Sequence, residues 1–305
     1  MSITVVGTVA FDDVVSPFGK IANGLGGSAT HFSVAASFFT TVKLVAVVGG
    51  DFPREHIDFF KSRKIDLEGL KVIPDGKTFK WVGSYGDDLN DAKTLETQLN
   101  VIANFKPEIP ETYKNNNVLF LANIDPDQQI RVIQNAGKPG LIALDTMNLW
   151  LDIKKDAVIK AIKMVDLVTI NEYEVRQLTG CHNMVDAAGM IRQMGPKIVV
   201  IKRGGYGALM FYQDQVFSAP AMPLKQIYDP TGAGDSFAGG MVGYLDLCGE
   251  VNLKTLKTAV ICGSVMASFN VEKFSCERLK EINRDDIIAR FKVFEDLVVF
   301  DGLKY

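Results

Sequence analysis

Several absences narrow the function of this 305-residue chain before any motif is considered. The three histidines form no H-E-x-x-H motif, and the cysteines are few and form no C-x-x-C pair: Cys181, Cys248, Cys262 and Cys276. These patterns give little support to a zinc site or a disulfide framework. We therefore expect a reducing, cytoplasmic location.

Long hydrophobic runs and basic runs are also missing. No segment reaches the roughly 18 apolar residues that span a bilayer, and the first residues lack the basic region of a signal peptide. With 33 basic and 36 acidic residues the net charge is −3, which argues against nucleic acid or an anionic membrane as a partner. Neither a G-x-S-x-G motif nor a G-x-x-x-x-G-K-[ST] phosphate loop occurs.

What is present is a repeated order of strands and helices. Unbroken apolar runs, typical of parallel strands covered on both faces, lie at residues 3–6, 44–48, 118–121, 141–144, 167–170 and 198–201. Segments of helical length lie at 28–39, 54–63, 127–135, 152–164 and 172–178, and after residue 230 at 233–247, 253–269 and from 275 onward. This order predicts an α/β fold with a doubly wound, mostly parallel sheet, in one domain spanning residues 1–305.

Two stretches break this order, at about residues 11–24 and 71–103. They contain strand-like, only partly apolar segments at 79–85 and 97–103 around a polar turn. We expect antiparallel strands that together make a small β-sheet lid over the edge of the large domain, with an ordinary surface hairpin as the alternative. The exposed edge of such a lid is a candidate surface for a homodimer.

The most informative segment is D-P-T-G-A-G-D-S-F-A-G-G at residues 229–240. Pro230 excludes a strand or a helix interior at the start of this segment, whereas the residues from 233 onward have helical spacing. Small residues leave backbone N–H groups free at the first turn of that helix, where the helix dipole adds positive potential. This pattern predicts an anion hole for a transferring phosphoryl group, made by Gly232, Ala233 and Gly234.

The carboxyl group of Asp235 follows in the same turn. It is either a capping carboxylate or a general base that accepts the proton of an attacking hydroxyl. We expect the helix dipole to lower its pKa and make it a weak base. A weak base suffices for phosphoryl transfer, which needs mainly positioning and charge stabilisation.

Residues 229–235 resemble the C-terminal signature of the ribokinase-like carbohydrate kinases, also called the PfkB family. Further motifs agree in order over essentially the whole chain: G-T-V-A-F-D at residues 7–12, the double glycine at 26–27, N-x-x-E at 171–174 and a strand-turn-strand at 200–208. The resemblance implies ATP-dependent phosphorylation of a hydroxymethyl group. We expect a small sugar as the acceptor; a nucleoside kinase is the alternative, and a catalytically inactive sugar- or nucleotide-binding protein is a more remote one.

The resemblance also implies a role for each matching residue. Asp235 matches the catalytic base, and residues 232–234 match the anion hole. The predicted acceptor-binding residues are Asp12, Gly26, Gly27, Ser28, His31 and Asn123. The predicted ATP-binding residues are Asn171, Lys202, Gly204, Gly207 and Gly263. Asn171 and Glu174 are expected to organise Mg²⁺, usually through water, and Asp229 and Thr231 make K⁺ a further candidate.

Elementary chemistry agrees with these roles but leaves structural alternatives open. A carboxylate such as Asp12 accepts two hydroxyl hydrogen bonds, yet the residue is also common in turns. Asn171 and Glu174 follow an apolar strand, where ligands of open α/β sheets gather and oxygen ligands suit Mg²⁺, yet the same pair makes a helix capping box. Gly204 and the glycine after it equally suit a plain hairpin turn.

The chain departs from the ribokinase pattern in two places. Ser28 and His31 stand where ribokinases typically have Lys and Asn, which argues against ribose itself; His31 is either an acceptor contact or a buried structural residue. Lys273 stands in a late loop where glycine is common, and either replaces the monovalent cation or faces solvent.

Two other features have a second interpretation. Residues 24–29 match G-x-G-x-x-A, with Asp51 about 20 residues further on, but the polar stretch before them is not the apolar strand that a dinucleotide-binding fingerprint follows. We therefore disfavour a dehydrogenase. Aromatic residues of the lid either stack a nucleobase or pack the lid against the body: Phe79, Trp81 and Tyr85.

Overall fold

The computed structural model describes residues 1–90 and 92–302. Within these residues, ten strands form the main sheet, in the order β14-β13-β12-β11-β10-β9-β1-β4-β5 with β6 also beside β4. Their bounds are β1 (Ser2–Val6), β4 (Thr41–Gly49), β5 (Ile65–Asp66), β6 (Leu70–Ile73), β9 (Val118–Leu121), β10 (Leu141–Asp145), β11 (Leu167–Asn171), β12 (Ile198–Lys202), β13 (Ala208–Tyr212) and β14 (Gln215–Ala219). Among these described strands, two pairs of the main sheet are antiparallel, β12 with β13 and β13 with β14, and the other pairs are parallel.

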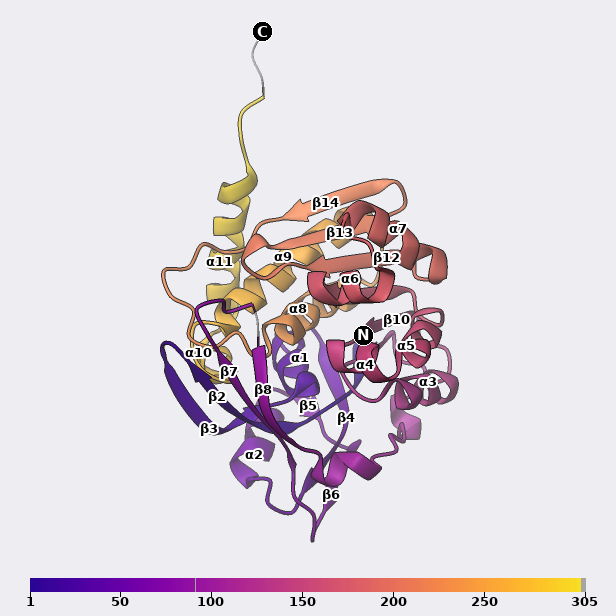
Figure 1. The fold of residues 1–305 in the computed structure, drawn as a ribbon, viewed down its shortest axis with the longest axis vertical. Coiled ribbons are helices and arrows are strands. Elements are labelled where there is room, and N and C mark those ends of the chain that lie inside the picture. The colour runs from indigo at the N-terminus through magenta and orange to yellow at the C-terminus, as the bar shows by residue number, and fades with distance from the viewer. Residues whose placement is uncertain (91, 303–305) are drawn as a thin grey trace.

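Helices cover both faces of the main sheet (Figure 1). One side carries α1 (Ser28–Ala36), α2 (Arg54–Ser62), α8 (Ala233–Cys248), α9 (Leu253–Asn270), α10 (Glu277–Glu281) and α11 (Arg284–Val298). The other carries α3 (Pro126–Asn135), α4 (Asn148–Ile153), α5 (Lys155–Ile162), α6 (Glu172–Thr179) and α7 (Met184–Met194). None of the described helices is both long and apolar enough to cross a bilayer.

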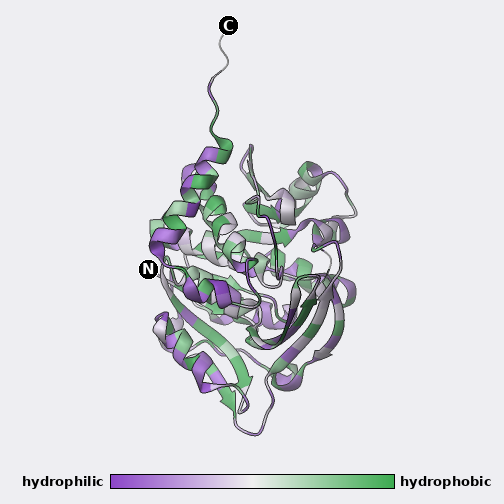
Figure 2. Ribbon diagram, turned by 90° about the vertical axis from the view of Figure 1, so that its left-hand side faces the viewer, coloured by the Kyte–Doolittle hydropathy of each residue, from purple (hydrophilic) through white to green (hydrophobic). Residues whose placement is uncertain are grey.

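The apolar runs of the sequence are explained by this double cover. Along β4, Leu44 and Ala46 belong to the core beneath the first group of helices, whereas Val45 between them belongs to the core beneath the second. Because successive side chains point to opposite faces, a strand buried on both faces must be apolar at every position. Figure 2 shows hydrophobic residues gathered in these strands. The predicted doubly wound, mostly parallel sheet is confirmed.

A separate four-stranded sheet in the order β3-β2-β7-β8 forms the lid (Figure 1). Its strands are β2 (Ala10–Ser16), β3 (Gly19–Gly26), β7 (Phe79–Tyr85) and β8 (Ala92–Gln98). The β2–β3 and β7–β8 pairs are antiparallel, as expected from the sequence, and a parallel pairing of β2 with β7 joins them. The two distant segments therefore make one sheet.

Three expected boundaries are wrong. The strand expected at 97–103 ends at Gln98, and the chain continues as the 3-10 turn η1 (Asn100–Asn104). Residues 71–73, expected in the lid, lie in β6 and pair with β4 of the main sheet. The helix expected at 152–164 is divided between α4 and α5, because Lys154 between them has φ −142°, which is not helical.

The dinucleotide-binding alternative is also wrong. Gly24 and Gly26 lie on β3, which pairs antiparallel with β2 in the lid rather than parallel within the main sheet. The Asp51 carboxylate accepts hydrogen bonds from the backbone and the hydroxyl of Thr78, at 2.8 and 2.7 Å. The glycines therefore do not form the strand-to-helix turn of a dinucleotide site.

Candidate active site

The first turn of α8 follows a glycine turn that provides free backbone donors. Gly232, the residue before the helix, has φ +73°, a left-handed conformation that glycine adopts without strain. The amide of Ala233 donates to the carbonyl oxygen of Pro230 at 3.1 Å, so it is engaged within the turn. The amides of Gly232 and Gly234 have no hydrogen-bond partner among the described residues. These two amides are the donors available to an anion.

Polar contacts from two other elements hold this turn in place. Asn270, the last residue of α9, donates through Nδ2 to the carbonyl oxygen of Thr231 at 2.8 Å and accepts from the Ser236 hydroxyl at 3.0 Å. The Asp229 carboxylate accepts from the amides of Thr231 and Ser275, at 2.9 and 3.0 Å. The donors at the start of α8 are therefore positioned before any ligand binds.

The same contacts involve the oxygens expected to hold K⁺. Both carboxylate oxygens of Asp229 accept backbone amides, and the Thr231 carbonyl accepts from Asn270. The Thr231 hydroxyl is hydrogen-bonded to the hydroxyl of Tyr85 at 3.1 Å. Each of these oxygens keeps a further lone pair, so the contacts do not decide whether a cation binds. K⁺ at this turn stays a prediction, and no step below depends on it.

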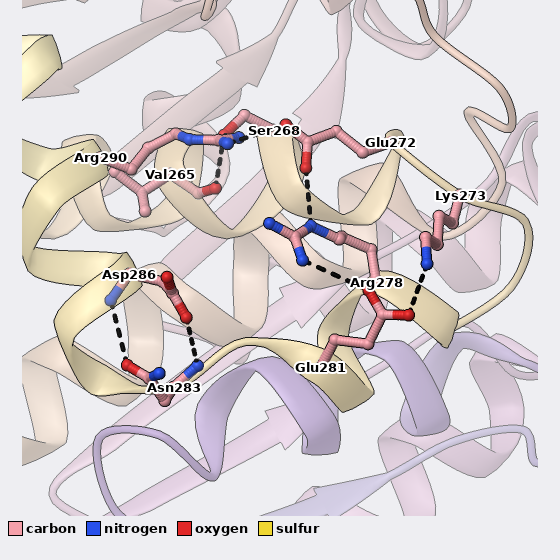
Figure 3. Close-up of polar contacts among 9 residues, drawn as sticks. All are labelled: Val265, Ser268, Glu272, Lys273, Arg278, Glu281, Asn283, Asp286 and Arg290. Carbon is pink, nitrogen blue, oxygen red and sulfur yellow. Dashed lines mark hydrogen bonds and ion pairs between the residues drawn. The ribbon is translucent and has the colours of Figure 1, made fainter.

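Lys273 faces solvent rather than the turn. Its ammonium pairs with Glu281 (Figure 3), and its side chain is 48% exposed. The neighbouring ion pairs hold the loop to α10 and α11: Glu272 accepts from Arg278 and Arg290, at 2.9 and 2.8 Å. Lys273 therefore does not take the place of a cation beside Asp229.

Asp235 lies in the first turn of α8 among other charged side chains. Burial, together with the negative charge of Asp145, raises its pKa to about 7, while Lys202 acts in the opposite direction. The expectation that the helix dipole would leave a weakened base is therefore wrong, because burial outweighs it. A carboxyl group that titrates near neutral pH is well suited to accept a proton in catalysis.

The carboxyl ends of β10, β11 and β12 supply the next polar groups, from Asp145, Asn171 and Lys202. The Lys202 ammonium donates to the Asp145 carboxylate at 2.5 Å, and the two side chains are only 16% and 3% exposed. Asp145 is not among the site residues predicted from the sequence. It follows the run 141–144 just as Asn171 follows 167–170, and that parallel could have identified it.

Asn171 and Glu174 form the capping box that the sequence left open. The Asn171 side chain accepts from the Glu174 amide at 2.8 Å, and the Glu174 carboxylate accepts from the Asn171 amide at 3.1 Å. Burial raises the pKa of Glu174 to about 8, against the effect of Lys202. The capping contacts fix both side chains at the edge where they were expected.

The charges at this edge suit a hydrated cation. Three acidic side chains, Asp145, Glu174 and Asp235, surround the single ammonium of Lys202. Among the described residues, no group of three or more His, Cys, Asp or Glu is arranged to hold a metal directly. The site therefore fits Mg²⁺ held through phosphate oxygens and water, because that ion keeps several waters.

On the lid side, the Asp12 carboxyl group faces the turn before α8. It lies on β2 and not in a turn, and a Cβ at Gly26 would overlap it, so this position requires glycine. Burial and the charge of Asp229 raise the pKa of Asp12 to about 7, with a further contribution from Asp235. The lid and the main body thus present two carboxyl groups to the same space.

The double glycine begins α1, and the residues after it are held by hydrogen bonds. Gly27 has φ +94°, and a side chain there would collide with the backbone of Thr8. The Ser28 amide donates to the Thr8 hydroxyl at 2.9 Å, and the Ser28 hydroxyl donates to the Asn123 carbonyl at 3.2 Å. The Asn123 side-chain oxygen accepts from the Trp150 ring at 2.7 Å. Ser28 and Asn123 thus brace the entrance to α1.

His31 is buried between α1 and α8. Asn270 donates through Nδ2 to a carbonyl, so its Oδ1 accepts from His31 Nδ1 at 2.9 Å, which assigns the proton to Nδ1. Burial lowers the pKa of His31 and keeps the ring neutral. Its Nε2 is then an acceptor without a partner among the described residues, and the ring lies against Gly232. His31 is therefore structural on one side and has a free acceptor on the other.

The glycines expected near ATP divide into two groups. Gly204 and Gly207, with φ +52° and +81°, form the β12–β13 turn, and Asn90 of the lid lies directly against Gly204. Gly263 lies on α9, where a Cβ would be 2.8 Å from the carbonyl oxygen of Phe237 on α8. Gly263 thus permits close packing of the two helices, whereas the other two glycines shape a turn at the β12 edge.

The aromatic residues of the lid have different surroundings. Tyr85 joins the lid to the body through its hydroxyl contact with Thr231, and burial raises its pKa. Trp81 pairs with Asp12 across the parallel β2–β7 ladder, so the two side chains share a face of the sheet. The Trp81 ring remains partly exposed and donates through Nε1 to the Thr94 hydroxyl at 3.1 Å. The ring lies over Gly83 of the same strand, so Trp81 and Asp12 share a face of the lid while the ring is directed toward β8.

Comparison with known proteins identifies the family. Residues 1–282 match the family model described as pfkB family carbohydrate kinase. The chain is 31% identical over 251 residues to the cytidine kinase of Thermococcus kodakarensis, covering 80% of this chain and 88% of that protein. It is 29% identical over 285 residues to the nucleoside kinase of Methanothermobacter thermautotrophicus, covering 88% of each.

A solved structure shows the shared fold. The fructokinase double mutant of Vibrio cholerae O395, with fructose, ADP and potassium ion bound, matches with a TM-score of 0.79 and 18% identity, over 95% of this chain and 98% of that one. At this identity the likeness shows the fold alone. Together with the family match and the identity to the cytidine kinase, the fold leads to one conclusion: the chain belongs to the pfkB family of carbohydrate kinases and is a phosphotransferase of sugar or nucleoside substrates.

Proposed function

We propose that the protein is an ATP-dependent nucleoside kinase, which transfers the γ-phosphoryl group of ATP to the hydroxymethyl group of a nucleoside. The observation that carries this choice is the 31% identity to a cytidine kinase over 80% of the chain. It reverses the order expected from the sequence, in which a small sugar came first. No observation of comparable weight favours a sugar.

The lid supports a nucleoside because it offers two kinds of contact on one face of its sheet. Asp12 is a carboxylate that accepts the paired hydroxyls of a ribose. Trp81 shares the face of the lid sheet with Asp12 and keeps part of its ring exposed. An aromatic face binds a nucleobase by stacking, worth about 1–3 kcal/mol per base. A free sugar would leave this platform unused.

The start of α8 provides the groups for transfer. Asp235 accepts the proton of the attacking hydroxyl, and the amides of Gly232 and Gly234 bind the oxygens of the phosphoryl group as negative charge shifts among them. Asn270 holds the turn through the Thr231 carbonyl, so these donors need no reorganisation. Asn171 and Glu174 would hold hydrated Mg²⁺, which neutralises phosphate charge when bound.

The test is a panel of acceptors assayed for ADP release with ATP and Mg²⁺. Cytidine, uridine, adenosine and inosine are compared with ribose and fructose, and an Asp235→Asn preparation reports contaminating kinases. We expect kcat/KM for at least one nucleoside to exceed that for either sugar by about tenfold or more, given the value of base stacking. A sugar that is the better acceptor would overturn the nucleoside assignment while leaving the kinase in place.

A further inference from the structure

We propose that Lys202 is a catalytic residue whose ammonium contacts the transferring phosphoryl group, and that Asp145 is the positioning residue that holds it there. The inference rests on the kinase activity of the family and is independent of whether the acceptor is a sugar or a nucleoside. The resemblance placed Lys202 only along the nucleotide, and Asp145 had no role.

The position of the Lys202 ammonium points to the reacting group. Lys202 is the last residue of β12, and its Nζ would lie 3.1 Å from a Cβ placed on Gly234. Gly234 carries one of the two free amides at the start of α8. A phosphoryl group bound to that amide, within reach of Asp235, would therefore also lie beside the ammonium. The three groups converge on one place from two elements of the fold.

The hydrogen-bond count leaves donors for a ligand. An ammonium has three N–H donors. One is used by the Asp145 carboxylate at 2.5 Å, and the other two have no acceptor among the described residues, although the Lys202 side chain is only 16% exposed. A charged donor in such a place is costly unless a partner arrives. A phosphoryl group, with several charged oxygens, is the partner that the site lacks.

Asp145 restricts where the lysine can point. Its Oδ1 accepts from the Thr146 amide at 2.9 Å and its Oδ2 accepts from Lys202, so the carboxylate is fixed at both oxygens. Lys202 reaches past the end of β11, which lies between β10 and β12. A lysine side chain otherwise loses about 2 kcal/mol of rotamer entropy when it is fixed. The contact with Asp145 therefore holds the Lys202 ammonium in place before ATP binds.

A purely structural role is the competing explanation. Asp145, Glu174 and Asp235 all act on Lys202, and the ammonium could serve only to neutralise them. The two roles differ in what they predict for nucleotides. Neutralisation affects ADP and ATP alike, because both bind the same folded site. Contact with the transferring group affects only the nucleotide that carries a γ-phosphate.

The experiment compares Lys202→Met with Lys202→Arg by calorimetry and single-turnover transfer. The probes are ADP and the non-hydrolysable analogue β,γ-imido-ATP, each with Mg²⁺. We expect Lys202→Met to slow transfer by about 10²–10³, as for loss of one preorganised donor, and to weaken the analogue while ADP affinity stays within about twofold. Lys202→Arg should recover part of the rate. Equal weakening of both nucleotides, or near-normal transfer by Lys202→Met, would overturn the proposal.

Two more variants keep the test decisive if Lys202→Met does not fold. Asp145→Asn keeps the shape of the side chain but removes the charge that holds Lys202, so we expect slower transfer with unchanged ADP affinity. Unchanged transfer in Asp145→Asn would remove its positioning role. The matched control is Lys197→Met, at the opposite end of the same strand and exposed, which should leave both affinities and the transfer rate unchanged.

Discussion

The carboxyl ends of β10–β12 and the lid are built in opposite ways. At the strand ends, Asp145 and Glu174 are almost fully buried and paired with neighbours. In the lid, β8 is exposed along nearly its whole length, and the lid meets the catalytic turn through the Tyr85–Thr231 contact. From this difference we expect a division of labour, in which the buried edge serves the transfer step of the proposed kinase and the more exposed lid sheet selects the acceptor.

The largest effect is expected for a change in the catalytic carboxyl group proposed at the start of α8. Replacing Asp235 by Asn should reduce kcat by about 10²–10⁴, the range for loss of a general base, without changing the affinity for ADP. Stopped-flow turnover and calorimetry measure the two quantities. A variant that keeps nearly full turnover would remove Asp235 as the base.

A smaller effect is expected for a change in the lid, and it should appear in acceptor binding alone. Replacing Trp81 by Ala should raise KM for a nucleoside by about 5- to 150-fold, the equivalent of one stacked base, with little change in kcat. The control is Val15→Ala, on an exposed position of β2. Steady-state kinetics with the preferred nucleoside measure both constants. A drop in kcat at constant KM would contradict a role of Trp81 in binding the nucleoside.

The pH dependence of kcat/KM tests the role of Asp235 as the base. Because the pKa of Asp235 is raised to about 7 and the base must be ionised, kcat/KM should fall about tenfold as the pH drops from 8 to 6. The pKa of Asp12 is also raised to about 7, so Asp12 can add to this fall through acceptor binding, and the Asp235→Asn variant should show a shallower one. A wild-type profile that stays flat across this range would contradict an Asp235 base with that pKa.

Stability should change with pH in the opposite sense. The pKa of Asp235 rises from 3.8 to about 7 on folding, so its carboxyl favours the folded state below 3.8 and loses that contribution as the pH rises through 7. Asn cannot ionise, so Asp235→Asn should raise Tm relative to wild type at pH 8 more than at pH 5. Calorimetric melting at the two pH values measures it, and an equal shift at both would contradict the burial of a charge.

The smallest effect tests the contact that joins the two regions. Replacing Tyr85 by Phe removes the hydroxyl that meets Thr231, a hydrogen bond worth about 1 kcal/mol, so transfer should slow by roughly fivefold. Because a closed lid excludes water, ATP hydrolysis relative to transfer should rise. The matched control is Tyr113→Phe, which loses a hydroxyl contact with Asp66 far from the lid and should leave the ratio unchanged. An unchanged ratio of hydrolysis to transfer in Tyr85→Phe would show that the Tyr85–Thr231 contact is not needed for lid closure.

The same comparison explains what the sequence could predict. Unbroken apolar runs predicted the buried strands, because burial on both faces leaves no other residue type, and the glycine turn predicted the start of α8. The lid strands are harder to predict, since half-exposed segments have weak patterns: the sequence predicts a strand at residues 100–103, which form a 3-10 turn. The sequence does not predict helix α7. Nor does it predict the helix break at Lys154, because neither proline nor glycine occurs there.

At the candidate site, individual residues can be predicted from the sequence where they belong to a recognisable motif. Contacts between distant segments were not. The pairing of Lys202 with Asp145, 57 positions earlier, depends on the order of β10, β11 and β12 in the sheet. The contact of Tyr85 with Thr231 depends on how the lid lies on the body. The raised pKa of Asp235 comes from burial and neighbours that the local sequence does not contain.

A crystal structure with ADP, aluminium fluoride and the preferred nucleoside gives the most direct test, since the fluoride mimics the phosphoryl group in transfer. The account predicts fluoride on the amides of Gly232 and Gly234, with the nucleoside's hydroxymethyl oxygen about 3 Å from the carboxylate of Asp235. Fluoride bound elsewhere, or a hydroxymethyl group turned away from Asp235, would contradict it.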